Sequence, residues 1–343
     1  MHLQPIFSKS DFGVVLDIDG VLIRQALHHR MFIILTFFSE NRGGTALPKA
    51  RQVLLDLKEN SIPHIFMTNG GGCLEEAKAR ELTEILDVPI NPNQVILSHT
   101  PMRQLADKAD INIVDSRVLV LGSNDVHKVA THYGFEKTTS VEEVVQQNPT
   151  QYPFRKYDHR EPPDANEPIA AAMIMHDPTD WALELQVLVD VLIGGNPPGV
   201  GCPYDSQTPL YVSNRDFTFA GAYPAPRFAQ GSFTDCLKLL YEKMTRKRLQ
   251  LTSFGKPFPI QYRYAEMLLN QFSRQPLAKI YGIGDNPDSD IQGANLAQKW
   301  SSILLRTGVY DGKTCLEHKP DYLCDTIEHA MRWIYDQHRF PYN

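Results

Sequence analysis

The sequence predicts an α/β fold built on a parallel sheet, with a second α/β unit in the middle of the chain. Residues 12–16 form an apolar run that ends near Gly20, which is typical of a buried parallel strand. Segments with helical spacing follow such strands repeatedly, and this alternation continues through residues 118–245. With 343 residues, the chain is long enough for two domains or for one domain with a large insertion.

Composition narrows the class of protein. The chain is 42% hydrophobic and 22% charged, which is ordinary for a globular protein in water, and its formal net charge is −6. A net negative charge gives no basic footprint for nucleic acid or for an anionic membrane surface. The most apolar run, residues 31–38, is too short to cross a bilayer, so we expect no transmembrane span.

Cysteine use and the first residues bear on the compartment. The five cysteines are widely spaced and form no CxxC motif, so the sequence predicts neither a disulfide framework nor a zinc site. A reducing compartment fits this pattern. The first ten residues lack the blocks of a signal peptide and the arginine of a mitochondrial presequence. The residues themselves therefore favour a cytoplasmic protein.

Hydrophobic periodicity places the elements in order. Short apolar runs predict strands at residues 12–16, 64–67, 94–97, 118–121, 169–175, 210–212, 251–254, 278–283 and 301–305. Helical spacing predicts helices at residues 47–60, 75–86, 100–109, 126–133, 183–193, 233–245 and 260–271, and one that begins near residue 291. Polar, Gly- and Pro-rich composition predicts loops at residues 148–168 and 217–232. Residues 23–44 could be a short strand, a lid helix or an insertion, with His28 and His29 expected at the surface.

The end of the first strand carries two aspartates. Successive side chains alternate in an extended chain, so Asp17 and Asp19 share one face. Two carboxylates held so close repel one another, and burying either alone is costly. Mg²⁺ prefers such oxygens and usually acts beside a phosphate. Turn or capping aspartates are the alternative on this stretch alone, since Asp-Gly is common turn chemistry.

Two later strand ends carry groups suited to a phosphate. Strand 64–67 runs into Thr68, Asn69 and a glycine cluster that begins at Gly70, and a polar helix follows. Free backbone N–H groups at such a turn bind anions well. Lys256 stands in a Gly-Lys-Pro turn and could meet a phosphate as a point charge. An ordinary connection and a solvated turn lysine are the alternatives for these segments.

A third strand end is acidic. Asp285 follows the predicted strand at residues 278–283, and Asp288 and Asp290 come next in a turn. Three carboxylates are too many for a simple helix cap, so metal binding or site chemistry is favoured. The ends of parallel strands converge on one crevice, which would gather carboxylates, N–H donors, a hydroxyl and a cation. That set of groups suits phosphoryl transfer.

Four motifs, in order along the chain, carry a family resemblance. DIDGV, FMTNGGG, GKP and GDNPDSDI resemble the motifs of the haloacid dehalogenase (HAD) superfamily of aspartyl-phosphate phosphatases. The long α/β unit between the second and third motifs is similar to the subclass with a large cap there, the NagD and para-nitrophenyl phosphatase type. Within it, PLYVSNRDF and RFAQGSF look most like the eukaryotic HAD-like hydrolase domain 5 family, also called the cat eye syndrome critical region protein 5 family.

The resemblance implies a Rossmann-like HAD core with an inserted α/β cap domain. It places the first part of the core in residues 1–98, the cap in residues 99–250 and the second part of the core in residues 251–343. One departure lies in residues 23–46, where the family usually has a short flap. That segment is either a lineage-specific insertion or a gene-model error such as a retained intron, and it lies beside the expected site.

The resemblance also implies chemical roles. Asp17 would be the nucleophile that becomes an aspartyl phosphate, and Asp19 the general acid and then the base that activates water. Mg²⁺ would be held by the carboxylates of Asp17 and Asp285 and the backbone carbonyl of Asp19. Lys256 would neutralise charge between nucleophile and phosphate, and Asp290 would support the metal shell or orient that lysine.

Other positions would hold the substrate. Thr68, Asn69 and Gly70 would grip the oxygens of the transferring phosphoryl group. Asn214 and Asp216 match an Asn-x-Asp segment of the family's cap, and the loop after Asp216 would select the substrate.

The resemblance therefore implies a Mg²⁺-dependent hydrolase that acts on a small phosphorylated metabolite, a phosphate monoester, beneath a cap that excludes water. Two other functions stay open: a non-catalytic member that binds a phosphometabolite or a partner, and a phosphotransferase that passes the phosphoryl group to an alcohol. Related proteins point to mitochondria, to glycerophospholipid metabolism and to caps that pair into homodimers. No nucleic-acid partner is expected.

Overall fold

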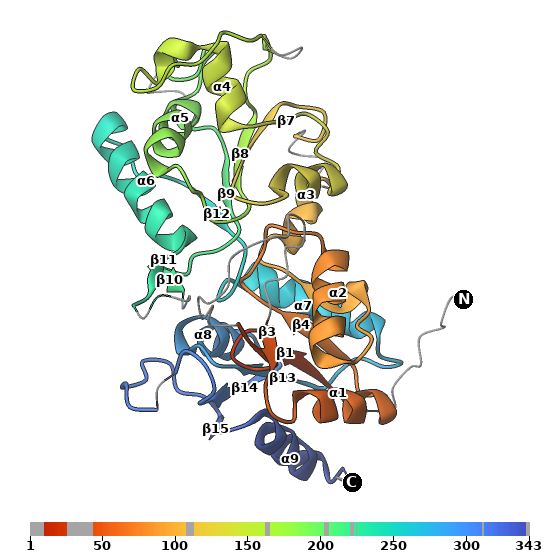
Figure 1. Cartoon of the computed structure of the whole chain (residues 1–343). Helices are drawn as coiled ribbons and strands as arrows, with labels where there is room; N and C mark the ends of the chain where they lie inside the picture. The colour runs from red at the N-terminus through yellow and green to blue at the C-terminus, as the bar shows by residue number, and fades with distance from the viewer. Residues whose placement is uncertain are drawn as a thin grey trace, which may run out of the picture.

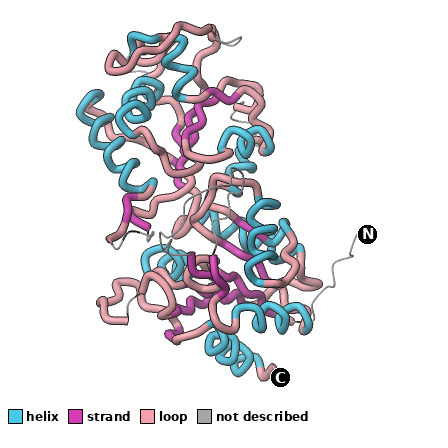
Figure 2. Tube along the Cα trace, in the orientation of Figure 1, coloured by secondary structure: helices cyan, strands magenta, loops and turns pink. Residues whose placement is uncertain are grey.

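Two parallel sheets, one in each of two α/β units, organise the chain (Figure 1). The computed structural model describes residues 10–25, 44–107, 113–161, 165–201, 206–219, 223, 225–310 and 312–340. Figure 2 shows most of the strands gathered into two groups, with helices around each. The predicted fold class is confirmed by this architecture.

The larger sheet has six strands in the order β15-β14-β13-β1-β4-β5, and all of its pairs are parallel. Its strands are β1 (Phe12–Leu16), β4 (His64–Met67), β5 (Val95–Ile96), β13 (Lys279–Gly284), β14 (Trp300–Leu305) and β15 (Tyr322–Cys324). Strand β1 lies between β4 and β13 and is buried over its whole length. The strand with the two aspartates is therefore central, as a near-continuous apolar run predicts.

Alternate residues of β1 face two layers of helices. Val14 and Leu16 pack in one core cluster with helices α1 (Ala50–Glu59), α2 (Glu75–Leu86) and α9 (Ile327–His338). Val15 packs in another cluster with α7 (Pro259–Gln271) and α8 (Gln292–Leu296). Helices thus cover both faces, which is what an all-parallel sheet needs to bury its apolar side chains.

The smaller sheet has five parallel strands in the order β12-β9-β8-β6-β7. Its strands are β6 (Val118–Leu121), β7 (Thr138–Thr139), β8 (Ala171–Ile174), β9 (Leu210–Val212) and β12 (Thr252–Ser253). One face packs against α4 (Val141–Gln147), α5 (Trp181–Ile193) and α6 (Gln230–Thr245), and the other against α3 (Val126–His132). Each sheet therefore has its own hydrophobic core.

Two antiparallel hairpins complete the strands of the described residues. Strands β2 (Ile23–Gln25) and β3 (Gly44–Ala46) pair with one another. The two ends of the segment at residues 23–44, for which three structures were considered, are therefore short antiparallel strands. The apolar run at residues 31–38 lies outside the described residues. Strands β10 (Thr218–Phe219) and β11 (Arg227–Phe228) pair within the segment that was predicted as a loop.

The described residues also contain three short 3₁₀ helices, η1 (Pro92–Gln94), η2 (Thr100–Leu105) and η3 (Pro149–Gln151), and one π-helical turn, η4 (Pro287–Ile291). The helix predicted at residues 100–109 is wrong in type, because η2 is a 3₁₀ helix. Pro101 stands in its first turn, and Met102 N–H donates to His99 O at a spacing of three residues. Helix α6 begins at Gln230, three residues before the predicted start. No helix of the described residues is long and apolar enough to cross a membrane.

The prediction for the segment before Lys256 needs a correction. Strand β12 pairs with β9 in the smaller sheet, so the lysine follows a strand of the cap unit and does not follow a strand of the core sheet. A short strand can pair with a strand that is distant in the sequence, so the local pattern of residues does not reveal which sheet it joins. We propose the domain division at residues 98 and 250 with one change: the chain leaves the cap after residue 253.

Candidate active site

Three strand ends of the core sheet bring polar side chains together. Asp17 follows β1, Thr68 and Asn69 follow β4, and Asp285 follows β13. These strands are neighbours and run parallel, so their carboxyl ends meet at one edge of the sheet. Asp290 reaches the same place from a π-helical turn, η4 (Pro287–Ile291), that comes directly after β13.

Lys256 joins this edge from the cap side. Its Nζ atom lies 2.6 Å from Asp17 Oδ1 and 2.6 Å from Asp290 Oδ1, and the lysine is only 2% exposed. Burial opposes the charge of Lys256, but the two carboxylates outweigh it and hold the pKa of the ammonium well above its usual range. The lysine is therefore charged, and it ties the nucleophile candidate to the turn that carries Asp290.

The site holds more negative charge than this lysine balances. Carboxylate oxygens of Asp17, Asp285 and Asp290 lie within 4.8 Å of one another, and all three residues are buried. Burial, together with the neighbouring Asp290, raises the pKa of Asp285 to about 7. Burial also raises the pKa of Asp17, against the lowering effect of Lys256. A hard divalent cation fits this donor set, since it would hold the carboxylates ionised.

Two glycines make room for the carboxylate of Asp285. Gly20 has a φ of +81°, and a Cβ atom there would lie 2.4 Å from Asp285 Oδ2. A Cβ atom on Gly308 would lie 1.9 Å from the same oxygen, which no packing tolerates. The backbone N–H of Val309 donates to Asp285 Oδ2 at 2.5 Å. The loop after β14 is thus part of the site, although sequence reasoning missed it; Gly308 just past a buried strand was the available signal.

The hairpin beside the site is linked to the same loop. The Thr307 hydroxyl donates to the backbone carbonyl of Gly20. Arg24, in strand β2, donates from Nη2 to the Thr307 carbonyl at 3.2 Å. Asp19 is half-buried at the turn between β1 and this hairpin, and its charge contributes to the raised pKa of Asp285. Asp19 therefore lies close enough to the carboxylates for its charge to act on Asp285.

The side chain of Asn69 links the core to the cap. Its Nδ2 atom donates to Asp216 Oδ2 at 3.1 Å and to the Lys256 carbonyl at 3.0 Å. Its Oδ1 atom accepts from the Lys256 N–H at 2.7 Å. Asn214 Nδ2 donates to the Asn69 carbonyl at 3.2 Å, and Asn214 Oδ1 accepts from the Asp216 N–H at 2.7 Å. The side-chain NH₂ group of Asn69 therefore makes both of its hydrogen bonds to protein groups.

These contacts bear on the predicted substrate grip. Because the Asn69 amide is engaged, it fixes the positions of Lys256 and Asp216 in this arrangement. Burial raises the pKa of Asp216 to about 6, although the hydrogen bond from Asn69 lowers it. The Gly70 N–H donates to Thr68 Oγ1 at 2.9 Å, which leaves the hydroxyl proton of Thr68 to point elsewhere. The hydroxyl of Thr68 thus keeps a donor for a phosphoryl oxygen.

The π-helical turn is held from two sides. A Cβ atom on Gly284 would lie 2.2 Å from the side chain of Asp290, so only glycine fits there. The hydroxyl of Tyr262, a buried residue of α7, lies 3.1 Å from the carbonyl oxygens of Ser289 and Asp290. The Asn286 N–H donates to Asp290 Oδ2 at 3.1 Å. Asp290 is therefore positioned firmly against Lys256, and Tyr262 was not foreseen from the sequence.

A buried carboxylate cluster with one lysine, at the carboxyl edge of a parallel sheet and under a second α/β unit, defines a hydrolase of the phosphoryl-transfer kind. The sequence profile for haloacid dehalogenase-like hydrolases matches residues 14–136, and a HAD-hydrolase-like profile matches residues 253–330. A mitochondrial hydrolase of Saccharomyces cerevisiae is 30% identical over 356 residues, covering 92% of this chain and 93% of that protein. The chain belongs to the haloacid dehalogenase-like hydrolases, as its motifs predicted.

A longer relative matches as well. A protein of Schizosaccharomyces pombe, named a cardiolipin synthase (CMP-forming) / mitochondrial hydrolase fusion protein, is 33% identical over 314 residues. The alignment covers 87% of this chain and 51% of that protein, so the chain spans about half the length of this relative.

Solved structures support the fold. A hypothetical protein from Pyrococcus horikoshii OT3 is similar with a TM-score of 0.68 at 18% identity, covering 94% of this chain and 99% of that one. NagD from E. coli K-12 gives a TM-score of 0.59 at 17% identity, covering 94% and 97%. A p-nitrophenyl phosphatase from Archaeoglobus fulgidus gives 0.61 at 15% identity, covering 94% and 98%. These likenesses confirm a HAD fold of the NagD and p-nitrophenyl phosphatase type.

Proposed function

We propose that this hydrolase is a Mg²⁺-dependent phosphatase that cleaves a small phosphate monoester through an aspartyl phosphate on Asp17. The observation that carries the proposal is the position of Asp17, at the tip of the central strand and 2.6 Å from the buried ammonium of Lys256. Lys256 holds Oδ1, which leaves the second carboxylate oxygen to attack phosphorus. The ammonium then offsets negative charge that builds up between Asp17 and the phosphoryl oxygens.

The proposed reaction has two steps. An oxygen of Asp17 forms a bond to phosphorus while the bond to the substrate's ester oxygen breaks, and Asp19 gives its proton to the departing alcohol. Asp19 then takes a proton from water, whose oxygen attacks phosphorus and displaces the Asp17 carboxylate. Inorganic phosphate and free enzyme result. The hydroxyl of Thr68 donates to a phosphoryl oxygen in both steps.

Mg²⁺ is the cation that we propose for the acidic cluster. Asp17, Asp285 and Asp290 offer oxygens within 4.8 Å of one another, and the backbone carbonyl of Asp19 would add a further one. A bound Mg²⁺ neutralises charge on the phosphoryl oxygens. Asp290 also contacts Lys256, so it is a metal ligand and an orienting group for the lysine in this proposal.

The cap contacts favour a small substrate. Asp216, next to the hairpin of β10 and β11, is hydrogen-bonded to Asn69 at the site, so the cap closes directly over the carboxylates. Small phosphorylated metabolites are the substrates that such an enclosed position admits. Exposed aromatic residues on the hairpin, Phe217, Phe219 and Phe228, would contact the alcohol part of the ester.

The names of the curated relatives guide the setting that we propose. Both are called mitochondrial hydrolases, and one is joined to a cardiolipin synthase. We therefore propose a mitochondrial location and a substrate from glycerophospholipid metabolism. We also propose that the cap mediates a homodimer, which sedimentation of the purified protein tests.

The test compares wild type with Asp17→Asn on p-nitrophenyl phosphate in the presence of MgCl₂. We expect Asp17→Asn to lose several kcal/mol of transition-state stabilisation, on the order of the loss at other nucleophiles. Asp288→Asn is the matched control, because Asp288 lies in the same motif as Asp285 and Asp290 but is exposed. Equal rates for wild type and Asp17→Asn would overturn the proposal.

Two further measurements separate the other functions. A protein that binds Mg²⁺ and a phosphate analogue without any turnover of a phosphometabolite panel would be a non-catalytic binder. Added acceptor alcohols that receive the phosphoryl group in place of water would identify a phosphotransferase. Release of inorganic phosphate at the same rate with and without acceptor supports the phosphatase.

A further inference from the structure

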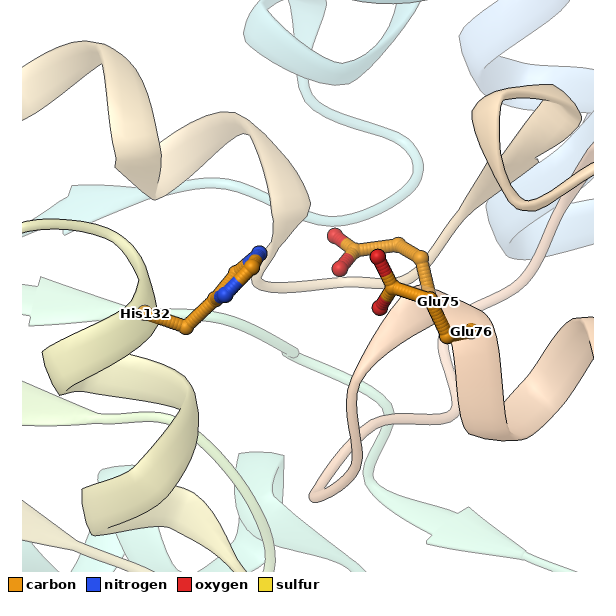
Figure 3. Close-up of side chains that lie close together, drawn as sticks. All are labelled: Glu75, Glu76 and His132. Atoms are coloured by element: carbon orange, nitrogen blue, oxygen red, sulfur yellow. The ribbon is translucent and has the colours of Figure 1, made fainter. Parts of the chain in front are cut away.

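A second group of metal-ligating side chains lies where the cap meets the core. Glu75 and Glu76 open helix α2 of the core, and His132 is the last residue of helix α3 of the cap. One carboxylate oxygen from each glutamate and one ring nitrogen of His132 lie within 4.8 Å of one another. Figure 3 shows both carboxylates directed towards the imidazole across the gap between the two helices.

One oxygen of Glu75 lacks a hydrogen bond. Glu75 is 5% exposed, and its Oε1 atom accepts from Thr100 Oγ1 at 2.7 Å, Tyr133 OH at 2.6 Å and Arg103 Nη2 at 3.2 Å. Its Oε2 atom is buried and finds no hydrogen-bond partner among the described residues. Leaving an oxygen of a buried carboxylate unsatisfied costs stability, and a cation on that oxygen would remove the cost.

We propose that Glu75, Glu76 and His132 bind a divalent cation of the Zn²⁺ class, which clasps the cap to the core. A set of two carboxylates and an imidazole suits Zn²⁺ and its transition-metal neighbours, whereas Mg²⁺ prefers oxygen ligands alone. Glu76 and His132 are exposed, so solvent can supply the remaining ligands and the ion can enter. The charge of Arg103 repels a cation, which sets the affinity below that of a closed structural zinc site.

The clasp would act on cap motion. Helix α2 follows the turn that carries Thr68 and Asn69, while α3 belongs to the unit built on the smaller sheet. An ion shared by these helices holds the cap in the position seen here. In enzymes with a covering domain, this domain has to open before the product can leave. An ion that holds the cap closed would therefore slow turnover, although it takes no part in the chemical step.

The experiment is a calorimetric titration of ZnCl₂ into the full-length protein in the presence of saturating MgCl₂. We expect one Zn²⁺ site that persists in excess Mg²⁺. Glu76→Gln and His132→Ala should each weaken it by at least about tenfold, the scale of losing a group that supports a metal site. His329→Ala is the control, since His329 is an exposed histidine of helix α9 and should leave the affinity unchanged.

Two further measurements distinguish the clasp, the Zn²⁺ site of Glu75, Glu76 and His132, from the catalytic site. Zn²⁺ affinity should survive in Asp285→Asn, which lacks a proposed Mg²⁺ ligand, and Zn²⁺ should raise the melting temperature of wild type but not of His132→Ala. Unchanged Zn²⁺ affinity in both clasp variants would overturn the proposal, as would full displacement of Zn²⁺ by Mg²⁺ in wild type. Because these readings do not depend on turnover, they stand apart from the test of the phosphatase.

Discussion

Replacing Lys256 by methionine tests whether one buried cation holds the carboxylate cluster together. The ammonium lies 2.6 Å from oxygens of both Asp17 and Asp290, and the lysine is 2% exposed. Methionine fills much of the same volume but carries no charge. Removing one partner of a buried ion pair costs about 3–5 kcal/mol. We expect a loss of that size in the free energy of unfolding at pH 8 without divalent cations.

The loss should shrink as the pH falls. Burial already raises the pKa of Asp285 to about 7 and raises the pKa of Asp17 against the lowering effect of Lys256, so the pKa of Asp17 should rise further once the lysine is gone. A carboxyl whose pKa is higher in the folded state adds no penalty below its unfolded pKa, and the penalty grows as pH rises through the folded pKa. The destabilisation is therefore expected to be smaller at pH 6 than at pH 8.

Urea unfolding followed by circular dichroism at the two pH values measures both effects. Mg²⁺ should restore part of the lost stability, because it neutralises the same carboxylates and binds only the folded state. Lys299→Met is the control, since Lys299 is exposed and its replacement should stay within about 0.5 kcal/mol. A loss under about 1 kcal/mol, equal at both pH values, is what an exposed pair gives and would refute the reasoning.

Three other predictions follow from the structure. Gly308→Ala puts a Cβ atom 1.9 Å from the Asp285 carboxylate, so the Mg²⁺ concentration for half-maximal activity should rise at least about tenfold; an unchanged Mg²⁺ titration would contradict this. Asn69→Ala removes one hydrogen bond to Asp216 of the cap and two to the backbone of Lys256, and it should lower kcat/KM by about 2–3 kcal/mol while making the cap segment easier to cleave in limited proteolysis. His64, whose pKa burial lowers to about 4, is neutral in the folded state, so stability should fall by about 3 kcal/mol as pH drops from 6.5 to 4. His64→Gln should flatten that part of the curve in urea unfolding; an equally steep fall would show that other groups cause it.

Local pattern predicted five of the six strands of the core sheet and missed the edge strand β15, since the strand at residues 301–305 was expected to be the last. Strand 64–67 and helix 75–86 have the predicted bounds, because a short apolar run before glycines and a regular 3.6-residue period leave little choice. The alternation rule put Asp17 and Asp19 on one side of the strand tip, and the parallel topology then brought Asp17 to Asp285 and Asp290. The carboxylate cluster was thus predictable from neighbouring residues and from the rule for strand ends.

The remaining parts of the site depend on pairing between distant segments. Lys256 arrives from a strand of the smaller sheet, and no local pattern distinguishes that from a core strand. The packing of Gly308 against Asp285 needs the loop after β14 to fold back over β1. The link from Asn69 to Asp216 joins residues 147 positions apart. Each of these contacts follows from tertiary structure, which overrides local propensity.

The central place of β1 has a consequence for synthesis of the protein. Strand β1 is made before the smaller sheet, but its partner β13 and the lysine beside Asp17, which is 239 residues further on, emerge from the ribosome only after that whole sheet. Until then one edge of β1 has no partner, which leaves a nascent apolar strand open to mispairing. Completion of the core sheet, and with it of the carboxylate cluster, therefore waits for the later part of the chain, whereas all five strands of the smaller sheet precede that part.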